Sequence, residues 1–143
     1  MIKYKLFSAG GNITALVKNA SQNHDLSVLA KQILLKEPKV EQVGFIFASS
    51  GNKEDFYLKM MGGELCINAA RSAAFDYCKQ NKTNRTKFKI SGTNSIIKAN
   101  LKNDEMELSL PESLIISNSK VKKGYLVNMK GIRFIVADAT NLN

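Results

Sequence analysis

Apolar and polar side chains alternate over residues 3–8, and a second strand-like run, residues 12–18, follows two glycines. Alternation with a period of two is typical of a β-strand that has one buried face. Gly10 and Gly11 separate the runs, and glycine readily takes the positive φ angles that a tight turn needs. The pattern therefore predicts a β-hairpin over residues 2–18.

Apolar residues at helical spacing predict two helices. The first follows Asp25, a favourable N-cap residue, and Pro38 ends it. Its apolar residues fall on one face, at Leu26, Leu29, Ala30, Ile33 and Leu34. The second extends from about Cys66 to Gln80. Small residues lie on several of its faces, at Ala69, Ala70, Ala73 and Ala74. Because bulky side chains would not fit there, we expect a sheet to enclose this helix closely.

Short runs rich in apolar and β-branched residues predict the remaining strands. Two runs precede the second helix, over residues 42–48 and 55–61, and Gly62 and Gly63 end the latter. Five runs follow it, over residues 87–91, 95–101, 105–110, 125–129 and 132–137. Many antiparallel strands with two helices predict an α+β fold. We expect a strongly curved, mostly antiparallel sheet that wraps the central alanine-rich helix, with one outer helix.

Length and composition indicate a single folded domain over residues 1–143. A chain of 143 residues with 44% hydrophobic residues can bury a core without disulfides. No apolar run is long enough to span a bilayer, and the N-terminal segment is too short and too strand-like for a signal sequence. We therefore expect a cytoplasmic protein with no membrane partner.

The chain carries a formal net charge of +9, which attracts anions. Its lysines are spread along the sequence, and the densest patch, residues 79–89, contains one aromatic residue, Phe88. Nucleic-acid surfaces combine clustered basic residues with stacking aromatic rings. A solvated basic surface is therefore the better interpretation, and we expect no nucleic-acid partner. An RNA-binding domain is the alternative that the charge leaves open.

Two cysteines, Cys66 and Cys78, fall in one predicted helix. Their separation along that helix is about 18 Å, so they cannot form a disulfide with each other. Cys66 stands where the glycine-broken strand becomes the helix. The positive end of the helix dipole favours a thiolate there, and the free N–H groups of the first turn can hold a carboxylate. This arrangement predicts an enzyme that acts on the carbon next to a carboxylate.

The other candidate side chains have structural interpretations. Cys78 is interpreted as a core residue. No cysteine or histidine cluster has the spacing of a metal site, so no metal ligand is assigned. His24 is the only histidine and lies in the predicted loop before the first helix. For Cys66, the alternative to catalysis is a small buried residue at the start of a helix.

Three separated segments carry a family resemblance. They are PheSerAlaGlyGlyAsn at residues 7–12, GluGlnValGly at residues 41–44 and GlyGlyGluLeuCysIleAsnAlaAlaArg at residues 62–71. Together they resemble the cofactor-independent amino-acid racemases and epimerases of the diaminopimelate epimerase fold, and most closely the histidine racemase branch. The resemblance extends over essentially the whole chain. It covers only the N-terminal lobe of a family whose members have two lobes.

The resemblance implies a mechanism without a cofactor: neither pyridoxal phosphate nor a metal takes part. Two cysteines face opposite sides of the substrate's α-carbon, where one removes a proton and the other returns one. Cys66 matches the first-lobe cysteine. The matching substrate-binding positions are Asn12, Gln42, Ile67, Asn68 and Ala69. Of these, Ile67 and Ala69 stand where the family usually has glycines.

The second lobe, with its own cysteine, has no counterpart in these 143 residues. We therefore expect Cys66 to supply half of an active site, and the chain alone to be inactive or nearly so. The other half would come from a C-terminal lobe or, in a homodimer, from a second copy of the chain. The implied substrate is a small amino acid, with histidine as one candidate. Tyr57 lies near the place where diaminopimelate epimerases carry an Asn, which disfavours diaminopimelate. The alternative function is a non-catalytic module that binds a small carboxylate or a partner protein.

Overall fold

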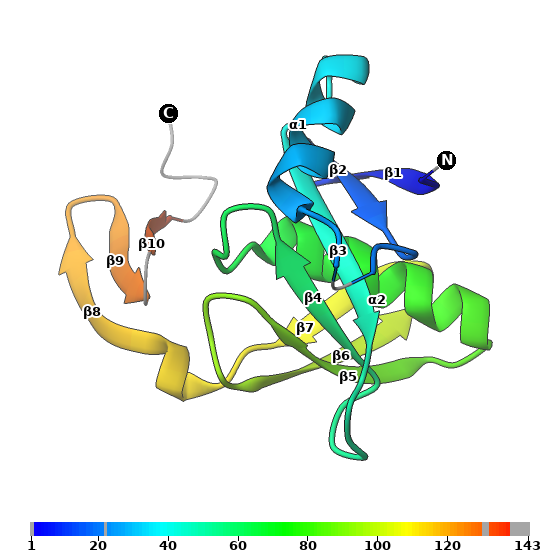
Figure 1. Ribbon diagram of the computed structural model, residues 1–143. Coiled ribbons are helices and arrows are strands. Elements are labelled where there is room, and N and C mark those ends of the chain that lie inside the picture. Colours follow the sequence, from blue (N-terminus) through cyan, green and yellow to red (C-terminus); the bar gives the residue numbers. More distant parts are fainter. Residues whose placement is uncertain (1, 22, 130–131, 138–143) are drawn as a thin grey trace.

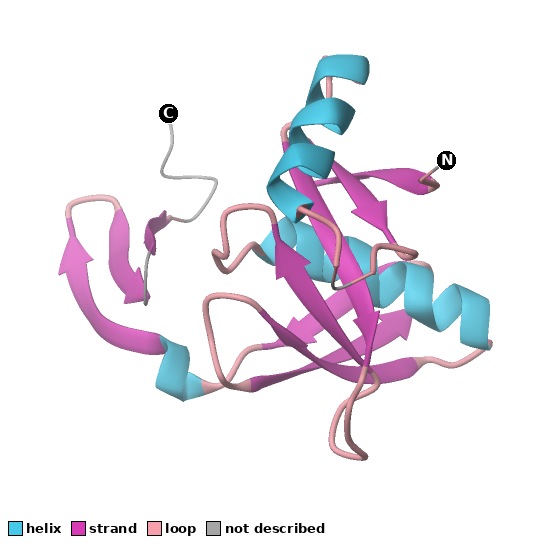
Figure 2. Cartoon of the chain, in the orientation of Figure 1, coloured by secondary structure: helices cyan, strands magenta, loops and turns pink. Residues whose placement is uncertain are grey.

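A seven-stranded sheet curled around one helix dominates the computed structural model, which describes residues 2–21, 23–129 and 132–137 (Figure 1). The strands of this sheet, in their order of pairing, are β1 (Tyr4–Ala9), β2 (Asn12–Val17), β3 (Gln42–Ala48), β4 (Phe56–Met60), β5 (Arg85–Ile90), β6 (Ile96–Lys102) and β7 (Glu105–Ser109). Helix α2 (Ile67–Asn81) lies in the hollow of the sheet, and helix α1 (Leu26–Lys36) lies outside it (Figure 2). The predicted α+β class is confirmed. The β2–β3 and β4–β5 pairs are parallel and the others are antiparallel.

The N-terminal hairpin forms because two adjacent glycines close it. Gly10 and Gly11 have φ angles of +61° and +89°, which match the twist of a two-residue hairpin turn. Asp25 caps α1, as predicted, by accepting from the N–H groups of Ser27 and Val28. Helix α1 connects β2 to the parallel strand β3 and packs on the sheet through a buried cluster. This cluster includes Ala15, Ala30, Ile33, Val43 and Phe45.

Helix α2 fits inside the sheet because its inward faces carry small residues. Four of its alanines are 0% exposed: Ala69, Ala70, Ala73 and Ala74. Large side chains of the sheet close around them, among them Leu58, Phe88 and Ile97. The rings of Phe56 and Phe88 stack with their centroids 4.7 Å apart. Large side chains on the sheet pack against small ones on the helix, and this packing holds the first turn of α2 in a defined place. The predicted enclosure of the helix is confirmed.

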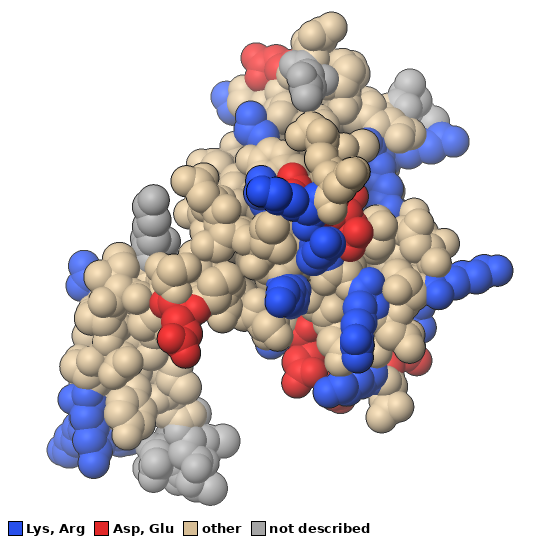
Figure 3. Space-filling model, turned by 90° about the horizontal axis from the view of Figure 1, so that it is seen from below, with Lys and Arg blue, Asp and Glu red and all other residues tan. Residues whose placement is uncertain are grey.

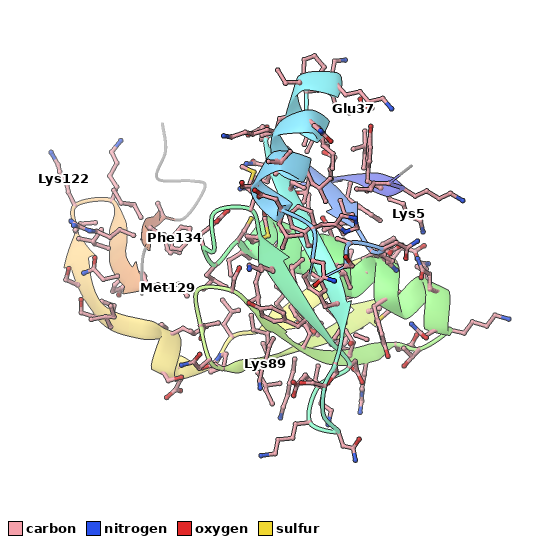
Figure 4. All side chains as sticks on the ribbon, in the orientation of Figure 1. Lys5, Glu37, Lys89, Lys122, Met129 and Phe134 are labelled. Carbon is pink, nitrogen blue, oxygen red and sulfur yellow. The ribbon has the colours of Figure 1, made fainter. Side chains whose placement is uncertain are left out.

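A separate three-stranded sheet follows the main one and projects from it (Figure 1). It consists of β8 (Ile115–Val121), β9 (Gly124–Met129) and β10 (Ile132–Val136), after a short 3-10 turn over Glu112–Leu114. Leu114 and Met129 join the main core, and Phe134 packs against it (Figure 4). The sequence does not predict β8, because six of its seven residues are exposed and no alternation marks it.

Asp76 ties α2 to the N-terminal hairpin. Its side chain is 5% exposed and pairs with the ammonium groups of Lys5 at 2.8 Å and Lys18 at 2.6 Å. Burial raises the pKa of the Asp76 carboxyl. The hydrogen bonds and charges of Lys18 and Lys5 outweigh burial, so this pKa lies below its usual value. The carboxylate form therefore stabilises the fold.

We expect Asp76→Asn to lower the free energy of unfolding by about 1–3 kcal/mol near neutral pH, because charge-assisted hydrogen bonds are lost. Since the folded-state pKa is depressed, this stabilisation is present above the unfolded-state pKa of about 3.9 and is lost as the pH falls through the folded-state value. Urea unfolding of both proteins, from neutral pH into acid, measures the difference. Asp104→Asn is the control. Asp104 pairs with Lys79 but its side chain is 75% exposed, and exposed ion pairs contribute less than about 1 kcal/mol to stability. A difference that does not change with pH would contradict the assignment.

Candidate active site

Cys66 lies at the start of α2, where the sequence predicts it. It is the N-cap residue, with an extended backbone at φ −119° and ψ 111°, and the helix begins at Ile67. The N–H of Ala69 donates to Sγ of Cys66 at 3.4 Å, so the sulfur takes the place of the usual capping oxygen. The first helical N–H groups, those of Ile67 and Asn68, have no partner within the helix. A negative charge is therefore favoured at this end of α2.

The second contact of the thiol is the side-chain amide of Gln42, at the start of β3. The S–H of Cys66 donates to Oε1 of Gln42 at 3.0 Å. The hydroxyl of the fully buried Thr14 lies 3.5 Å from the same oxygen. An amide can accept from a thiol through its oxygen or donate to a thiolate through its nitrogen. Gln42 can therefore serve both protonation states of Cys66. The sequence places Gln42 at the site but carries no signal for Thr14.

The segment that leads into α2 is held by Ser91 and Gly92, which follow β5. The hydroxyl of Ser91 donates to the carbonyl oxygen of Glu64 at 2.9 Å. Gly92 has a φ angle of +83°, and a Cβ there would lie 2.4 Å from the backbone nitrogen of Leu65. Only glycine fits this position. In the sequence, these two residues indicate a turn and nothing more.

The N-terminal hairpin turn reaches the same end of α2. A Cβ on Gly10 would lie 3.0 Å from Oδ1 of Asn68, so the two turns are in close contact. A cavity of about 530 Å³ includes Gly10 in its wall and extends past Arg71 beside the helix. Asn12 ends the hairpin turn, and its amide donates to Oε2 of Glu41 at 3.2 Å. Asn68 therefore lies at the start of α2, beside the hairpin turn. Asn12 is hydrogen-bonded to Glu41, the residue before Gln42.

Cys78 lies apart from this site. It is 1% exposed, about three turns further along α2. Burial, followed by the charge of Asp55, raises the pKa of its thiol. A thiol with a raised pKa stays protonated near neutral pH and is a poor base. The interpretation of Cys78 as a core residue is confirmed.

One protein family matches the chain over residues 1–142, the histidine racemase CntK N-terminal domain. The chain belongs to this family. A histidine racemase of Fusobacterium nucleatum is 31% identical over an alignment of 144 positions, and the alignment covers 88% of this chain and 50% of that protein. A diaminopimelate epimerase of Campylobacter jejuni subsp. doylei is 28% identical over 128 residues, or 86% of this chain and 51% of the relative. A histidine racemase of Staphylococcus aureus is 25% identical over 129 residues, covering 87% and 47% of the two proteins.

The names of these relatives are those of amino-acid isomerases, and they confirm the resemblance drawn from the three sequence segments. The chain spans about half the length of the curated relatives it matches.

Ile67 and Ala69 stand at the two positions where the resemblance implies glycines. Ile67 is half-buried and packs against the main core. Ala69 is 0% exposed as a whole residue, and its N–H is bound to Sγ of Cys66. Substrate binding by these two residues stays a prediction, as it does for Asn12, Gln42 and Asn68.

Two further properties concern the described residues only. None of their helices is both long enough and apolar enough to cross a bilayer. Among the same residues, no three His, Cys, Asp or Glu side chains gather in a way that could hold a metal ion.

Proposed function

We propose that this chain supplies one of the two thiols of an amino-acid racemase or epimerase that uses neither pyridoxal phosphate nor a metal. One observation carries the proposal: Sγ of Cys66 caps α2, accepts the N–H of Ala69 and contacts the amide of Gln42. The positive end of the helix dipole favours a negative charge at this position. The isomerase names of the relatives support the reaction class.

In the proposed reaction, the Cys66 thiolate removes the proton from the α-carbon of the amino acid. The Cα–H bond breaks, an S–H bond forms, and the electron pair moves toward the α-carboxylate. The first N–H groups of α2, those of Ile67 and Asn68, stabilise the added charge because they are held in place before the reaction. An acid on the opposite face then donates a proton to the α-carbon and inverts its configuration.

The second acid has to come from another lobe, because Cys78 is buried in the core. The sheet formed by β8, β9 and β10 supports a packing site for that lobe. Its exposed apolar residues include Ile116 and Ile135, each 69% exposed, and Val136, 56% exposed. Exposed apolar surface of this kind marks an interaction site. We propose that a second lobe covers it, with a second copy of the chain as the alternative partner.

Histidine is the substrate that we favour. The matching family and two of the relatives are named for histidine racemase, and another relative is named for diaminopimelate. Tyr57 provides an argument against diaminopimelate. Its neighbours Phe56 and Leu58 are buried in the cluster that contains Cys66. Because side chains alternate along a strand, Tyr57 faces the other side of the sheet. It therefore offers no contact to the far end of a substrate held at Cys66.

The half-site proposal predicts that the purified chain does not racemise histidine. The chain is incubated with L-histidine in heavy water, and α-proton exchange is followed by NMR and D-histidine by chiral chromatography. We expect no D-histidine from the monomer. Sedimentation of the same sample defines its oligomeric state. Racemisation by a monomer would overturn the half-site proposal, and racemisation that rises with the dimer fraction would identify the homodimer as the active form. Diaminopimelate in a parallel sample tests the substrate choice.

A non-catalytic module that binds a small carboxylate is the second candidate function. The burial of Cys66, which is 8% exposed, favours it. Alkylation by iodoacetamide near neutral pH discriminates the two functions, with Cys78 as an internal reference. Fast labelling of Cys66 that histidine slows would support the racemase. Labelling as slow as that of Cys78 would support the module.

A further inference from the structure

An elongated groove lies on the outer face of the main sheet. Its first part has a volume of about 500 Å³, and its wall includes Phe47, Glu54, Tyr57, Lys59 and Lys89. Its second part, of about 450 Å³, is bordered by Gly63 and by residues 91–94, which follow β5. Tyr57 and Lys59 line both parts. Together the two parts have room for a ligand longer than a single amino acid.

This groove is on the opposite side of the sheet from the Cys66 thiol. The other residues of β4 are buried in the cluster that contains Cys66: Phe56, Leu58 and Met60. Strand alternation therefore turns Tyr57 and Lys59 outward. Figure 4 shows Lys89 of β5 on the same outer side, pointing away from α2. A ligand on the first part of the groove would therefore not compete with the proposed substrate, whereas the second part borders Ser91 and Gly92, which hold the segment before Cys66.

Two aromatic rings line the first part of the groove. Phe47 of β3 and Tyr57 of β4 are directly opposite each other in register, and their rings stack with centroids 6.5 Å apart. Both side chains are partly exposed. Flat rings on a sheet are the surfaces on which unpaired nucleic-acid bases stack. Glu54, whose side chain is 9% exposed and lies 3.5 Å from the ammonium group of Lys89, adds an acceptor for an amino group of a base.

Lysines from three strands extend this surface beyond the aromatic rings. Lys87 and Lys98 face each other across β5 and β6, although like charges directly opposite are destabilising. In the part of the chain that the structure describes, neither of them forms an ion pair, and nor does Lys59. Figure 3 views the molecule from this side and shows its basic side chains gathered there. Unneutralised charge of this kind attracts a polyanion.

The fold thus combines features that the sequence keeps apart. The lysines are dispersed along the chain, which is why the sequence favours a solvated surface, but pairing of β4, β5 and β6 brings them beside the aromatic rings. We propose that this groove binds single-stranded nucleic acid, with a base stacked on Phe47 and Tyr57. The phosphates follow Lys59, Lys87, Lys89 and Lys98. The length of the groove and the number of lysines favour a strand over a free nucleotide.

The test measures binding of a fluorescein-labelled single strand of about twelve nucleotides to the whole chain. Fluorescence anisotropy is recorded over a range of salt concentrations. We expect the logarithm of the association constant to fall with the logarithm of salt with a slope of about −2 to −3, for three or four phosphate contacts. Binding without salt dependence would overturn the proposal. Equal affinity for a duplex of the same sequence would also overturn it, because paired bases cannot stack on Tyr57.

Matched variants separate this surface from net charge. The groove variant replaces Lys59, Lys87 and Lys98 with glutamine, and the control replaces Lys120, Lys122 and Lys123, which lie in the exposed β8–β9 hairpin or at its turn. We expect the groove variant to bind at least about 10-fold more weakly with a smaller salt slope, and the control to stay within about 2-fold. Equal losses would overturn the proposal. The groove variant should fold normally, because these lysines form no ion pair with another described residue.

The aromatic contribution is tested with Tyr57→Leu, which keeps an apolar side chain and removes the ring. We expect the strand to bind roughly 5- to 100-fold more weakly, with the salt slope unchanged. Unchanged affinity in this variant would overturn the stacking. AMP serves as a competitor. AMP and an unlabelled strand are compared at equal concentrations of nucleotide. If AMP displaces the labelled strand as well as the unlabelled strand does, the groove holds a single nucleotide and the proposal of a strand is overturned.

Discussion

Cys66→Ser should lower the rate of α-proton exchange in the proposed enzyme of this chain and a second lobe by at least about 10³-fold, because a serine hydroxyl does not ionise near neutral pH and cannot act as the base. Serine is itself a favourable N-cap residue. It can therefore accept the N–H of Ala69 in place of Sγ, and the free energy of unfolding should change little. Loss of exchange without loss of stability is the result expected for a catalytic thiol.

The measurement combines NMR of histidine in heavy water with urea unfolding of the same samples. Cys78→Ser is the matched control, since it places the same hydroxyl in the core. We expect Cys78→Ser to destabilise the fold by about 1–3 kcal/mol, because the hydroxyl is buried among apolar groups, and to leave exchange per folded molecule unchanged. Exchange within about 10-fold of the wild type in Cys66→Ser for both enantiomers of histidine would rule out this thiol as the base.

Local patterns were sufficient to predict the elements around the candidate site. Asp25 and Pro38 mark the beginning and end of the first helix because caps and helix breakers act over a few residues. The four alanines of α2 identify it as an enclosed helix, since small residues are needed where a sheet approaches closely. The change from glycine-rich turn to helix places Cys66 at the N-cap. Each of these signals is contained within a single stretch of sequence.

Contacts between distant segments were not predictable in the same way. The hydrogen bond between Ser91 and Glu64 joins residues 27 positions apart, and a SerGly pair looks the same in any turn. Thr14 comes to the thiol through the parallel pairing of β2 with β3, which depends on the crossover through α1. The basic outer face depends on strand register, because a shift by one residue would turn Lys87 and Lys98 inward. These features follow from tertiary pairing, which a single sequence does not specify.

Gly92→Ala should be among the most destabilising single substitutions near the candidate site. The φ angle of +83° at Gly92 costs an L-residue about 1–2 kcal/mol. The new Cβ would also lie 2.4 Å from the backbone nitrogen of Leu65, so the main chain before Cys66 would have to move. Because both penalties add and backbone is the obstructing group, we expect the free energy of unfolding to fall by at least about 3 kcal/mol. Urea unfolding at neutral pH measures this change.

Gly63→Ala separates the two penalties. Gly63 has a φ angle of +75°, but nothing lies within 4 Å of the position that a Cβ would occupy. Gly63→Ala should therefore lower the free energy of unfolding only by the conformational penalty of the positive φ angle, about 1–2 kcal/mol. Iodoacetamide labelling of Cys66 in the folded state adds a local measurement, because movement of Leu65 displaces the N-cap. We expect an altered labelling rate in Gly92→Ala and an unaltered rate in Gly63→Ala. Equal destabilisation of the two variants would show that contact between Gly92 and Leu65 does not position the thiol.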